Sequence, residues 1–445
     1  MVADTAVRTP SKRYRTFVLL LLTLVYGFNF IDRQIVGILA PFIQADLDLT
    51  NTQLGLLIGL AFATFYTVMG IPLAYLADRI NRVNLLAVAL AFWSAATAAT
   101  GFAQNFLHIG LARIAVGVGE AGGSPPSHSI ISDLYAKEER SGALGVYALG
   151  IPLGIMSAYF ITAALLGADP NTVDWRRIFI ILGISGIALA VLVRVVIREP
   201  MRGAMELGTA AKPPKVPFFE GLKRLLTIPS WWWMCLGIAF ASFAGYAVSG
   251  FQTKFLRLLD PEFNFRTIVI WIGIINGTFY VAGTYFGAKL VDWRAKRDVR
   301  AYGTIPAISL LLAFPLAILA FWAPTVVAHL AWGAALQLLL GVYLGPSFAI
   351  AQTLAPISLR AMSTALFFFI LNMIALGGGP TFAGAMIDVF LGRGMGELDA
   401  TRMAMTWTFA ALLLGAAFYL LVRMTLPKDW AEAEARNSQA AAATA

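Results

Sequence analysis

Residues 113–126 read Arg-Ile-Ala-Val-Gly-Val-Gly-Glu-Ala-Gly-Gly-Ser-Pro-Pro, and the interpretation of the whole chain depends on this stretch. Arg113 and Glu120 are seven residues apart, about two helical turns, so on a helix they share one face. In a bilayer each ionised side chain would cost roughly 2.5–3.5 kcal/mol on insertion scales. If the stretch spans a membrane, both charges therefore need a partner or a water-filled cavity.

The composition favours such a span. The chain has 445 residues, of which 59% are hydrophobic and 13% charged, and its mean hydropathy is +0.75. Soluble proteins carry roughly 25% charged residues, so this chain lacks the polar surface of a soluble protein. The net charge of +9 comes from basic residues spread between apolar segments, which favours basic cytoplasmic loops over a nucleic-acid-binding surface. The single cysteine, Cys235, excludes an intramolecular disulfide.

Apolar runs long enough to cross roughly 30 Å of hydrocarbon recur along the chain. We therefore predict an all-α polytopic membrane protein with twelve transmembrane helices, at 16–40, 52–76, 84–103, 107–134, 141–166, 177–197, 231–256, 266–290, 301–322, 326–352, 361–386 and 404–423. Pro125 and Pro126 are expected to end the regular membrane helix of the fourth span, with a shorter cytoplasmic continuation beyond.

The loops predict the orientation and the domains. Lys and Arg are frequent in the N-terminal tail, the central linker and the loops 77–83, 135–140 and 291–300. The positive-inside rule then places both termini in the cytoplasm, and we expect a bacterial inner membrane. The predicted parts are a tail (1–15), a six-helix bundle (16–197), a linker (198–230), a second six-helix bundle (231–423) and a disordered or frayed tail (424–445). A short amphipathic helix is expected within 218–227.

An internal repeat supports two similar bundles. Thr64-Phe65-Tyr66 precedes Asp78 by the same spacing at which Thr278-Phe279-Tyr280 precedes Asp292, and basic residues follow each aspartate. Duplicated halves joined by a cytoplasmic linker suit a transporter whose two bundles rock about a site between them.

One loop carries a family resemblance. Residues 74–82, Ala-Tyr-Leu-Ala-Asp-Arg-Ile-Asn-Arg, resemble the loop signature of the major facilitator superfamily, although Ala74, Asn81 and Val83 depart from the usual residues. The alternative is an ordinary basic loop. The resemblance implies a major facilitator fold, and a conformational role in closing the cytoplasmic side for Asp78, Arg79, Arg82, Arg140 and Asp292.

A glycine and proline pattern in the fifth span is similar to a helix motif of the same superfamily. It contains Gly150, Pro152 and Gly154, and Gly379-Pro380 is its counterpart in the second half. Small residues let helices approach closely and proline bends a helix, so we expect packing and hinge positions here.

The first span carries a second pair of charges, Asp32 and Arg33. One interpretation is a neutralised pair that reaches the membrane interface. The other is that Arg33 lines a central cavity and binds an anionic head group by paired hydrogen bonds, with Asp32 modulating it or pairing with it.

Glu120 also has two interpretations. It could form a structural salt bridge to Arg33 or Arg113, or its charge could be exchangeable. Burial disfavours the charged form of a carboxylate and a nearby arginine favours it, so proton binding could free the arginine for an anionic substrate. Arg113 itself resembles an arginine common in the fourth helix of the superfamily.

Several short patches resemble the spinster branch of the superfamily. They are Asp32-Arg33, Gly119-Glu-Ala121, Ser132-Asp-Leu-Tyr135, Gly150-Ile-Pro-Leu-Gly154 and a Gly345-Pro346…Arg360-Ala361 stretch. The resemblance implies export of lysolipids or sphingoid phosphates, proton coupling, and roles for the first-helix arginine and fourth-helix glutamate, here Arg33 and Glu120.

The second half has no buried acid to match Glu120. Tyr246, Gln352 and Asn372 are polar positions in its spans that could line a cavity, and packing hydrogen bonds are the alternative. Such an asymmetric cavity would suit a substrate with a charged head and an acyl tail.

The favoured prediction is a proton-coupled secondary active transporter that works by alternating access on an amphipathic or anionic lipid-like substrate. Transport of a small organic anion or drug-like compound is the alternative, and a membrane enzyme or a non-transporting sensor is an alternative of another class. The chain contains no Walker A, His-Glu-x-x-His or Gly-x-Ser-x-Gly sequence. We expect a monomer with the bilayer, protons and a small molecule or lysolipid as partners, and with no catalytic residue, cofactor, metal or nucleic acid.

Overall fold

The computed structural model describes residues 11–167, 173–202, 217–356 and 359–442. Within these ranges the regular secondary structure is helical and no strand is found. Eleven helical segments of the described residues are long and apolar enough to cross a membrane. The predicted fourth span (107–134) supplies the twelfth, because it is divided into two shorter helices. The prediction of an all-α polytopic membrane protein is confirmed.

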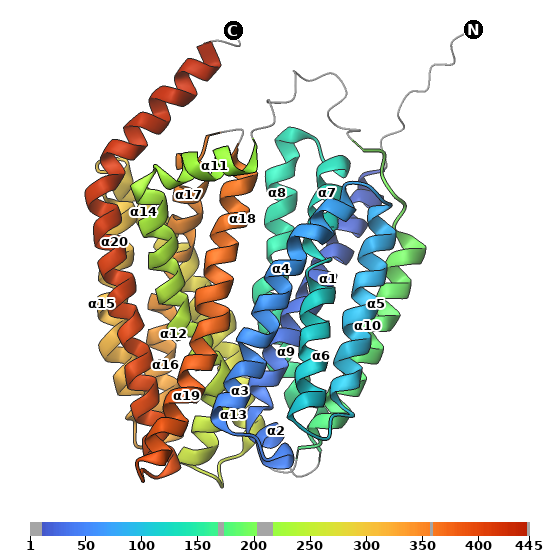
Figure 1. The fold of residues 1–445 in the computed structure, drawn as a ribbon, viewed down its shortest axis with the longest axis vertical. Coiled ribbons are helices and arrows are strands. Elements are labelled where there is room, and N and C mark those ends of the chain that lie inside the picture. Colours follow the sequence, from blue (N-terminus) through green and yellow to red (C-terminus); the bar gives the residue numbers. More distant parts are fainter. Residues whose placement is uncertain (1–10, 168–172, 203–216, 357–358, 443–445) are drawn as a thin grey trace. The chain divides into compact units, whose positions relative to one another are not determined.

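Contacts group the described residues into two compact units, each considered by itself. The first unit comprises Met1–Val36 and Thr64–Ala211. Its helices, shown in Figure 1, are α1 (Lys12–Ile38), α4 (Leu60–Ala77), α5 (Arg82–Thr100), α6 (Phe106–Glu120), α7 (Ser124–Leu134), α8 (Lys137–Ala148), α9 (Gly150–Leu165) and α10 (Trp175–Val196).

Helix α5 packs against both α6 and α10 in the first unit. Small residues permit the close approach of these helices. A Cβ added to Gly119 of α6 would lie 2.7 Å from Cβ of Trp93, and one added to Gly186 of α10 would overlap Ser94. The fully buried indole of Trp93 therefore fills the space that glycine leaves between α5 and α6.

The second unit comprises Gly37–Ala63 and Lys212–Ala445. Its helices are α2 (Ala40–Leu47), α3 (Asn51–Ile58), α11 (Phe218–Leu226), α12 (Pro229–Leu259), α13 (Phe265–Ile275), the π-helix η1 (Asn276–Tyr280), α14 (Val281–Ala295), α15 (Ala301–Phe321), α16 (Val326–Gly341), α17 (Leu344–Leu354), α18 (Arg360–Leu371), the π-helix η3 (Asn372–Gly378), α19 (Gly379–Gly392) and α20 (Glu397–Ala442).

Helix α12 is central to the second unit, where it packs against α20, α19 and α18 among others. The early segment 37–63 belongs here because α2 packs on α12 and α3 packs on α19. As a result, α1 and α4 each pass from one unit to the other, α1 after Val36 and α4 before Thr64.

Several helix boundaries differ from expectation. Helix α6 ends at Glu120, before the prolines. Pro125 and Pro126 lie in the first turn of α7, the shorter helix beyond, because proline is tolerated in the first turn of a helix, where its missing N–H is not needed. The C-terminal tail after Leu426 is expected to be disordered or a frayed helix, and it is helical, because α20 continues to Ala442. The short helix expected within 218–227 is found as α11, and most of the linker before it lies outside the described residues.

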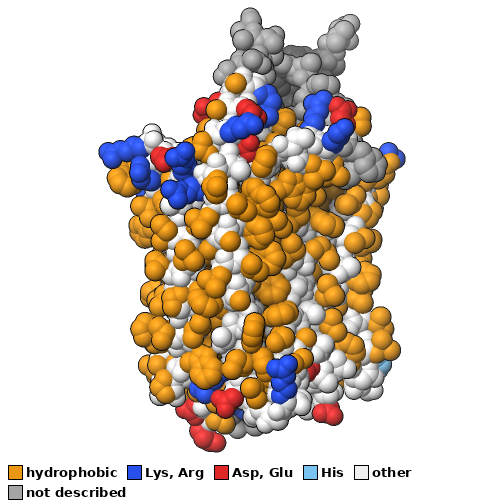
Figure 2. Space-filling view, turned by 60° about the vertical axis from the view of Figure 1, so that its left-hand side comes forward, with side chains coloured by type: hydrophobic (Ala, Val, Ile, Leu, Met, Phe, Trp, Pro, Cys, Tyr) orange, Lys and Arg blue, Asp and Glu red, His pale blue; other side chains and the backbone are white. Residues whose placement is uncertain are grey.

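The surface matches a membrane location. On the face shown in Figure 2, hydrophobic side chains cover the middle, and charged side chains gather toward the two ends. Large apolar side chains such as Phe286, Leu312 and Leu414 are at least half exposed. A face of this kind is stable against lipid tails and not against water.

Candidate functional site

A buried ion pair joins α1 and α6 in the first unit. Nε of Arg33 donates to Oε2 of Glu120 over 2.8 Å, and the side chains of Arg33 and Glu120 are 12% and 0% exposed. The second oxygen of Glu120, Oε1, is buried and accepts no hydrogen bond from the described residues, although Asn29 lies nearby. Arg33 therefore contacts one of the two carboxylate oxygens, and Asn29 is among the other residues around Glu120.

Aromatic rings surround the guanidinium of Arg33. Its Cζ lies 4.3 Å from the ring centre of Tyr66 on α4 and 5.0 Å from that of Phe30 on α1. Arginine is attracted to aromatic faces, and the attraction strengthens as water is excluded. The two rings orient Arg33 without adding a second negative charge.

A second acid and a second arginine lie beside this pair. Nη1 of Arg113 donates to the backbone carbonyl of Asp32 over 3.5 Å. The Asp32 side chain faces Trp93 and Thr97 of α5 and is electrostatically coupled to Arg113 and Glu120. Asp32 and Arg113 are only 3% and 2% exposed. The group therefore contains two acids and two arginines, and its formal charges cancel.

The pairing within this group differs from one sequence-based expectation. Arg33 pairs with Glu120, on another helix, and Asp32 lies near Arg113 instead of pairing with its neighbour Arg33. Consecutive residues of a helix point about 100° apart, so Asp32 and Arg33 face different neighbours. The structural salt bridge considered for Glu120 exists, and its presence is compatible with either interpretation of that residue.

The break between α6 and α7 fixes the position of Glu120. Helix α6 ends at Glu120, and Ala121–Gly123 turn before α7 begins at Ser124. The N–H of Gly123 donates to the carbonyl of Glu120 over 3.0 Å, and that of Gly122 to Gly119. A charged side chain thus sits at the end of a helix inside the span, where the three small residues of the turn leave room for it.

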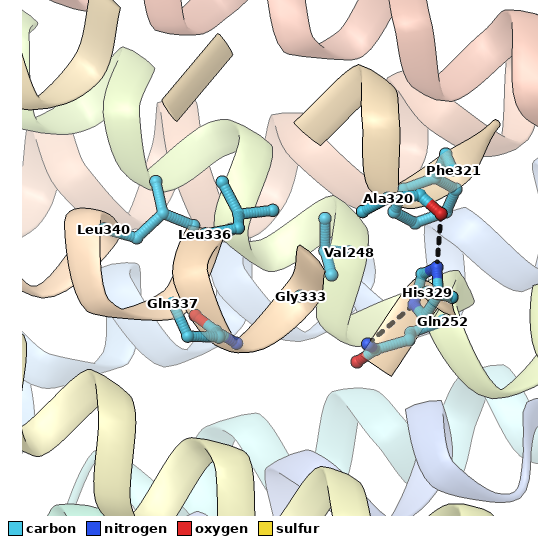
Figure 3. A pocket seen from close by; sticks show the side chains of 10 residues that line it. Val248, Gln252, Ala320, Phe321, His329, Gly333, Leu336, Gln337 and Leu340 are labelled. Carbon is cyan, nitrogen blue, oxygen red and sulfur yellow. Dashed lines mark hydrogen bonds between the residues drawn. The ribbon is translucent and has the colours of Figure 1, made fainter. Parts of the chain in front are cut away.

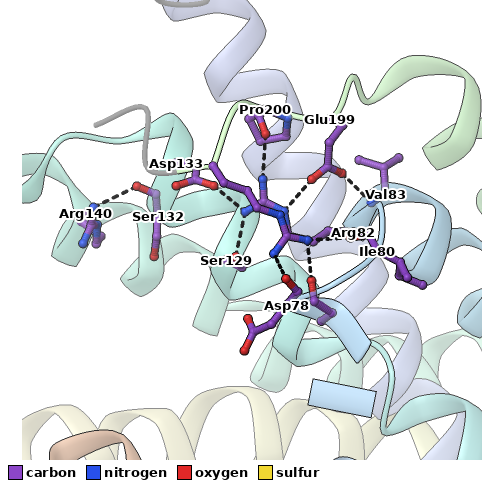
Figure 4. Close-up of polar contacts among 12 residues, drawn as sticks. Asp78, Ile80, Arg82, Val83, Ser129, Ser132, Asp133, Arg140, Glu199 and Pro200 are labelled. Carbon is purple, nitrogen blue, oxygen red and sulfur yellow. Dashed lines mark hydrogen bonds and ion pairs between the residues drawn. The ribbon is translucent and has the colours of Figure 1, made fainter. Parts of the chain in front are cut away.

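A separate polar cluster surrounds Arg82 (Figure 4). Arg82 is 1% exposed and begins α5. It forms ion pairs with Asp133 at the end of α7 and with Glu199, the latter at 2.6 Å. It also donates to Ser129 Oγ (2.7 Å) and the carbonyl of Pro200 (2.8 Å). Arg82 therefore ties the start of α5 to α7 and to the segment after α10.

The other predicted gating residues make contacts separate from those of Arg82. Asp78 is exposed, and its backbone carbonyl accepts from Arg202, as do those of Ala77 and Ile80 (Figure 4 labels Asp78 and Ile80). Arg79 stacks on Tyr75 at 3.9 Å.

Two further members of that set make hydrogen bonds of their own. Arg140 donates to the carbonyl of Ser132 over 2.9 Å. Asp292, in the second unit, accepts from the hydroxyl of Tyr302 over 3.0 Å.

The predicted hinge residues lie at close helix contacts within their units. A Cβ on Gly150 or Gly154 of α9 would come within 3.0 Å of α1, and Pro152 lies between them. Gly379 begins α19 at the end of η3, where it contacts the backbone of Phe243, and Pro380 follows it.

The second-unit residues proposed to line a cavity lie on three different helices, α12, α17 and η3. Tyr246 on α12 is half-buried and is coupled electrostatically to Tyr280, as is Tyr343. Asn372 is buried at the start of η3. Gln352 is exposed on α17 and donates to Thr364 over 2.7 Å.

A small pocket of the second unit contains polar residues that sequence analysis did not select (Figure 3). Nδ1 of His329 lies 2.9 Å from the carbonyl of Ala320, so that nitrogen carries the proton, and Nε2 accepts from Gln252 at 3.1 Å. Phe255 and Phe321 flank the imidazole. The histidine is thereby neutral and fully bonded, which fits a packing role.

Other contacts of the site were also missed, although each had a weak signal. Tyr66 belongs to the repeated Thr-Phe-Tyr sequence, Asp133 lies in a Ser-Asp-Leu-Tyr patch, and Glu199 follows the sixth span directly. None of these signals identifies the residue that the side chain contacts, because contacting residues such as Arg82 and Glu199 are more than a hundred positions apart in the sequence.

Comparison with known proteins adds to this geometry. Residues 22–380 match the sequence model of the Major Facilitator Superfamily. The chain is 31% identical over 418 residues to an MFS-type efflux pump of Mycolicibacterium smegmatis, covering 93% of this chain and 94% of that protein. It is 30% identical over 266 residues to Protein spinster homolog 1 of Bos taurus, covering 58% of this chain and 48% of that protein. The chain thus aligns with about half the length of that relative.

A solved structure is similar over almost the whole chain. It is the crystal structure of a bacterial homolog of the human lysosomal transporter Spinster, in an inward-facing and unoccupied conformation. The TM-score is 0.86 at 30% sequence identity, and the match covers 94% of this chain and 99% of that one.

Proposed function

This chain belongs to the major facilitator superfamily, in which it is related to spinster proteins and to an efflux pump, and on that premise we propose a specific transport function. The protein is a proton-coupled secondary active transporter that works by alternating access. Its substrate is an amphipathic anion of the lysolipid or sphingoid type.

The observation that carries the proposal is the buried ion pair of Arg33 and Glu120, at 2.8 Å. Taking two charges out of water is costly, and the cost is recovered only while both partners are charged and in contact. A proton on Glu120 removes one charge and leaves Arg33 in need of another anion. An anionic head group would satisfy that need, so proton binding and substrate binding at this pair depend on each other.

Neighbouring residues support this exchange. Asp32 and Arg113 form a second buried acid and base beside the pair, so a proton could pass to Asp32 or the substrate could contact Arg113. The planar guanidinium of Arg33 matches the geometry of a phosphate or carboxylate, and Tyr66 and Phe30 would hold it in place as its partner changes.

The remaining predicted residues take roles in the same cycle. The bundles 16–197 and 231–423 move relative to each other, with Gly150, Pro152, Gly154, Gly379 and Pro380 as packing and hinge positions. The cytoplasmic side is controlled by Asp78, Arg79, Arg82, Arg140 and Asp292. Tyr246, Gln352 and Asn372 contribute uncharged polar contacts to the substrate. We further propose a monomer in a bacterial inner membrane with both termini cytoplasmic.

A second candidate substrate is a small organic anion or drug-like compound. The relative from Mycolicibacterium smegmatis, aligned over 94% of its length, is an MFS-type efflux pump, and this favours it. The head-group chemistry at Arg33 would be the same. The two candidates differ in whether an acyl tail is needed.

The test is transport in reconstituted vesicles with an imposed pH gradient. Lysolipids of increasing chain length, a small organic anion and a neutral sugar are supplied separately. We expect the pH gradient to drive movement of the lysolipid, with a dependence on chain length. Transport restricted to small hydrophilic sugars would contradict the lipid-like substrate, and equal transport of the short anion would favour the second candidate.

Two variants test the coupling. Glu120→Gln should abolish proton-linked movement, because the amide cannot exchange a proton, while the folded protein is retained. Glu139→Gln is the matched control, since that glutamate also pairs with an arginine, Arg15, but is 53% exposed. A Glu120→Gln protein with unchanged pH dependence of transport would show that Glu120 does not carry the proton.

A further inference from the structure

One carboxylate holds the segment 37–63 within the second unit. Oδ1 of Asp388, on α19, accepts from the N–H of Asn51 (3.1 Å) and from its side-chain amide (2.8 Å). Oδ2 accepts from the N–H of Thr52 (2.7 Å) and from its hydroxyl (2.6 Å). Asp388 therefore accepts four hydrogen bonds from the first two residues of α3.

A buried lysine extends this contact. Nζ of Lys254, near the end of α12, bonds to Oδ1 of Asn51 and lies 2.7 Å from Oε1 of Glu397, the first residue of α20. The lysine side chain is 4% exposed. We call Asn51, Thr52, Lys254, Asp388 and Glu397 the Asp388 clamp. It joins the start of α3 to three helices of the second half of the chain.

Elsewhere the segment meets these helices through both small and large residues. Cζ of Arg257, on α12, lies 5.3 Å from the centre of the Phe42 ring. Thr253 donates to the carbonyl of Gly37 over 2.8 Å, and Thr381 to that of Gly55 over 3.3 Å. A Cβ on Gly59 would lie 2.7 Å from the carbonyl of Gly377. At these glycines the contact is with backbone atoms, whereas the contact between Phe42 and Arg257 must also be given up if the segment separates. The charged hydrogen bonds of the clamp are the stronger part of the contact.

The clamp also lies where the chain passes between the two units. The segment 37–63 belongs to the second unit by its contacts, and it is continuous at both ends with helices of the first unit. Any rearrangement that separates the outer parts of α1 and α4 from α12 and α19 must break the clamp.

We propose that the Asp388 clamp is a latch, which holds the segment 37–63 against α12, α19 and α20 in one conformation and is released during the transport cycle. The clamp lies at the ends of α12 and α19 and the start of α20, so it is remote from the C-terminal end of α20. With cytoplasmic termini it would face the outside of the cell. The proposal concerns conformation and does not depend on the proton or on the substrate.

The latch is tested by the accessibility of a thiol beneath the segment. Cys235 is the only cysteine, so Cys235→Ala provides a background without thiols. Thr253→Cys then places a reporter at a site that is 1% exposed and covered by Gly37. The full chain is placed in lipid nanodiscs, where both membrane faces are accessible, and reacted with a polar maleimide. The labelling rate measures how often the segment separates.

Three changes are compared in that background. Asp388→Asn removes the charge and keeps the side-chain size, and should raise the labelling rate about tenfold, in line with the loss of charge-assisted hydrogen bonds. Asp388→Ala removes all four bonds and should raise it further. Asp399→Asn is the matched control, because Asp399 lies on α20 near the same helix ends but is 66% exposed, and it should leave the rate unchanged.

A second reporter separates release of the latch from unfolding. Thr162→Cys in α9 is 0% exposed in the first unit and is remote from the clamp in sequence and contacts. Protection of this thiol in the Asp388 variants, together with faster labelling at residue 253, supports the latch. Unchanged labelling at residue 253 overturns it, and so does equal exposure of both thiols, which would assign Asp388 to stability alone.

Discussion

Replacing Arg82 by alanine should destabilise the first unit strongly. Arg82 is 1% exposed and bonds to Asp133, Glu199, Ser129 and the carbonyl of Pro200. Removing one partner of a buried ion pair costs about 3–5 kcal/mol, because the other charge is left buried and unpaired. Asp133 and Glu199 keep 11% and 25% of their side chains exposed, so water relieves part of this cost. We therefore expect Arg82→Ala to lower the free energy of unfolding by about 3 kcal/mol, the lower end of this range.

That loss can be converted into a melting temperature. For a folding unit of 150–250 residues, 1 kcal/mol corresponds to about 2–4 °C, so the expected fall in Tm is about 6–12 °C. The Tm of Arg82→Lys should lie between those of the unmodified protein and Arg82→Ala, since lysine keeps the charge but cannot make the same forked set of hydrogen bonds. The assay is thermal unfolding of the purified protein in detergent, followed by intrinsic tryptophan fluorescence.

Arg79→Ala provides the matched control for this experiment. Arg79 lies in the same loop but is exposed and stacks only on Tyr75 among the described contacts of its guanidinium. Its loss should lower Tm by no more than about 4 °C, since exposed cation–π contacts contribute about 0.5–1 kcal/mol. Equal shifts for the two alanine variants, or an unchanged Tm for Arg82→Ala, would refute the reasoning.

Two further predictions concern helix contacts. Gly119→Val should destabilise the protein by about 1–3 kcal/mol, because its Cβ would press on Trp93. Gly142→Val, with nothing within 4 Å of its Cβ, should cost under about 1 kcal/mol. Equal losses of Tm for the two variants would contradict this. Asp429→Ala removes the carboxylate that accepts from the N–H of Ser230 over 2.8 Å, and should cost about 1 kcal/mol. Hydrogen exchange in the first turn of α12 should then be faster, and unchanged exchange there would exclude a capping role.

The membrane-spanning architecture could be predicted from the sequence because it depends on local properties. Each span needs about 20 apolar residues to satisfy its backbone within the lipid, and such runs are visible without tertiary information. Breaks within spans are harder to predict. Pro125 and Pro126 predict the end of the regular membrane helix with a shorter continuation beyond. The structure ends α6 earlier, at Glu120, and places both prolines in the first turn of α7, which proline suits.

The charged residues of the candidate site could be predicted from the sequence, but the ion pairs that they form could not. Charges within apolar spans are rare enough to select Asp32, Arg33, Arg113 and Glu120 directly. Which acid meets which arginine depends on helix rotation and on the turn after Glu120, and the sequence left both partners open. The grouping of 37–63 with the second unit depends wholly on contacts between distant residues, such as Asn51 and Asp388.

The passage of α1 from one unit to the other has a consequence for register. Arg33 lies three residues before Val36, the last residue of the first unit on α1, and Gly37 begins the clamped segment. The ion pair and the latched segment are therefore separated by about one helical turn, with no loop between them. Each residue of a helix contributes about 100° of rotation. Inserting or deleting a residue in that turn would rotate the segment relative to Arg33 by about 100°. The number of residues in the turn therefore determines which way the segment would be displaced by a movement of Arg33.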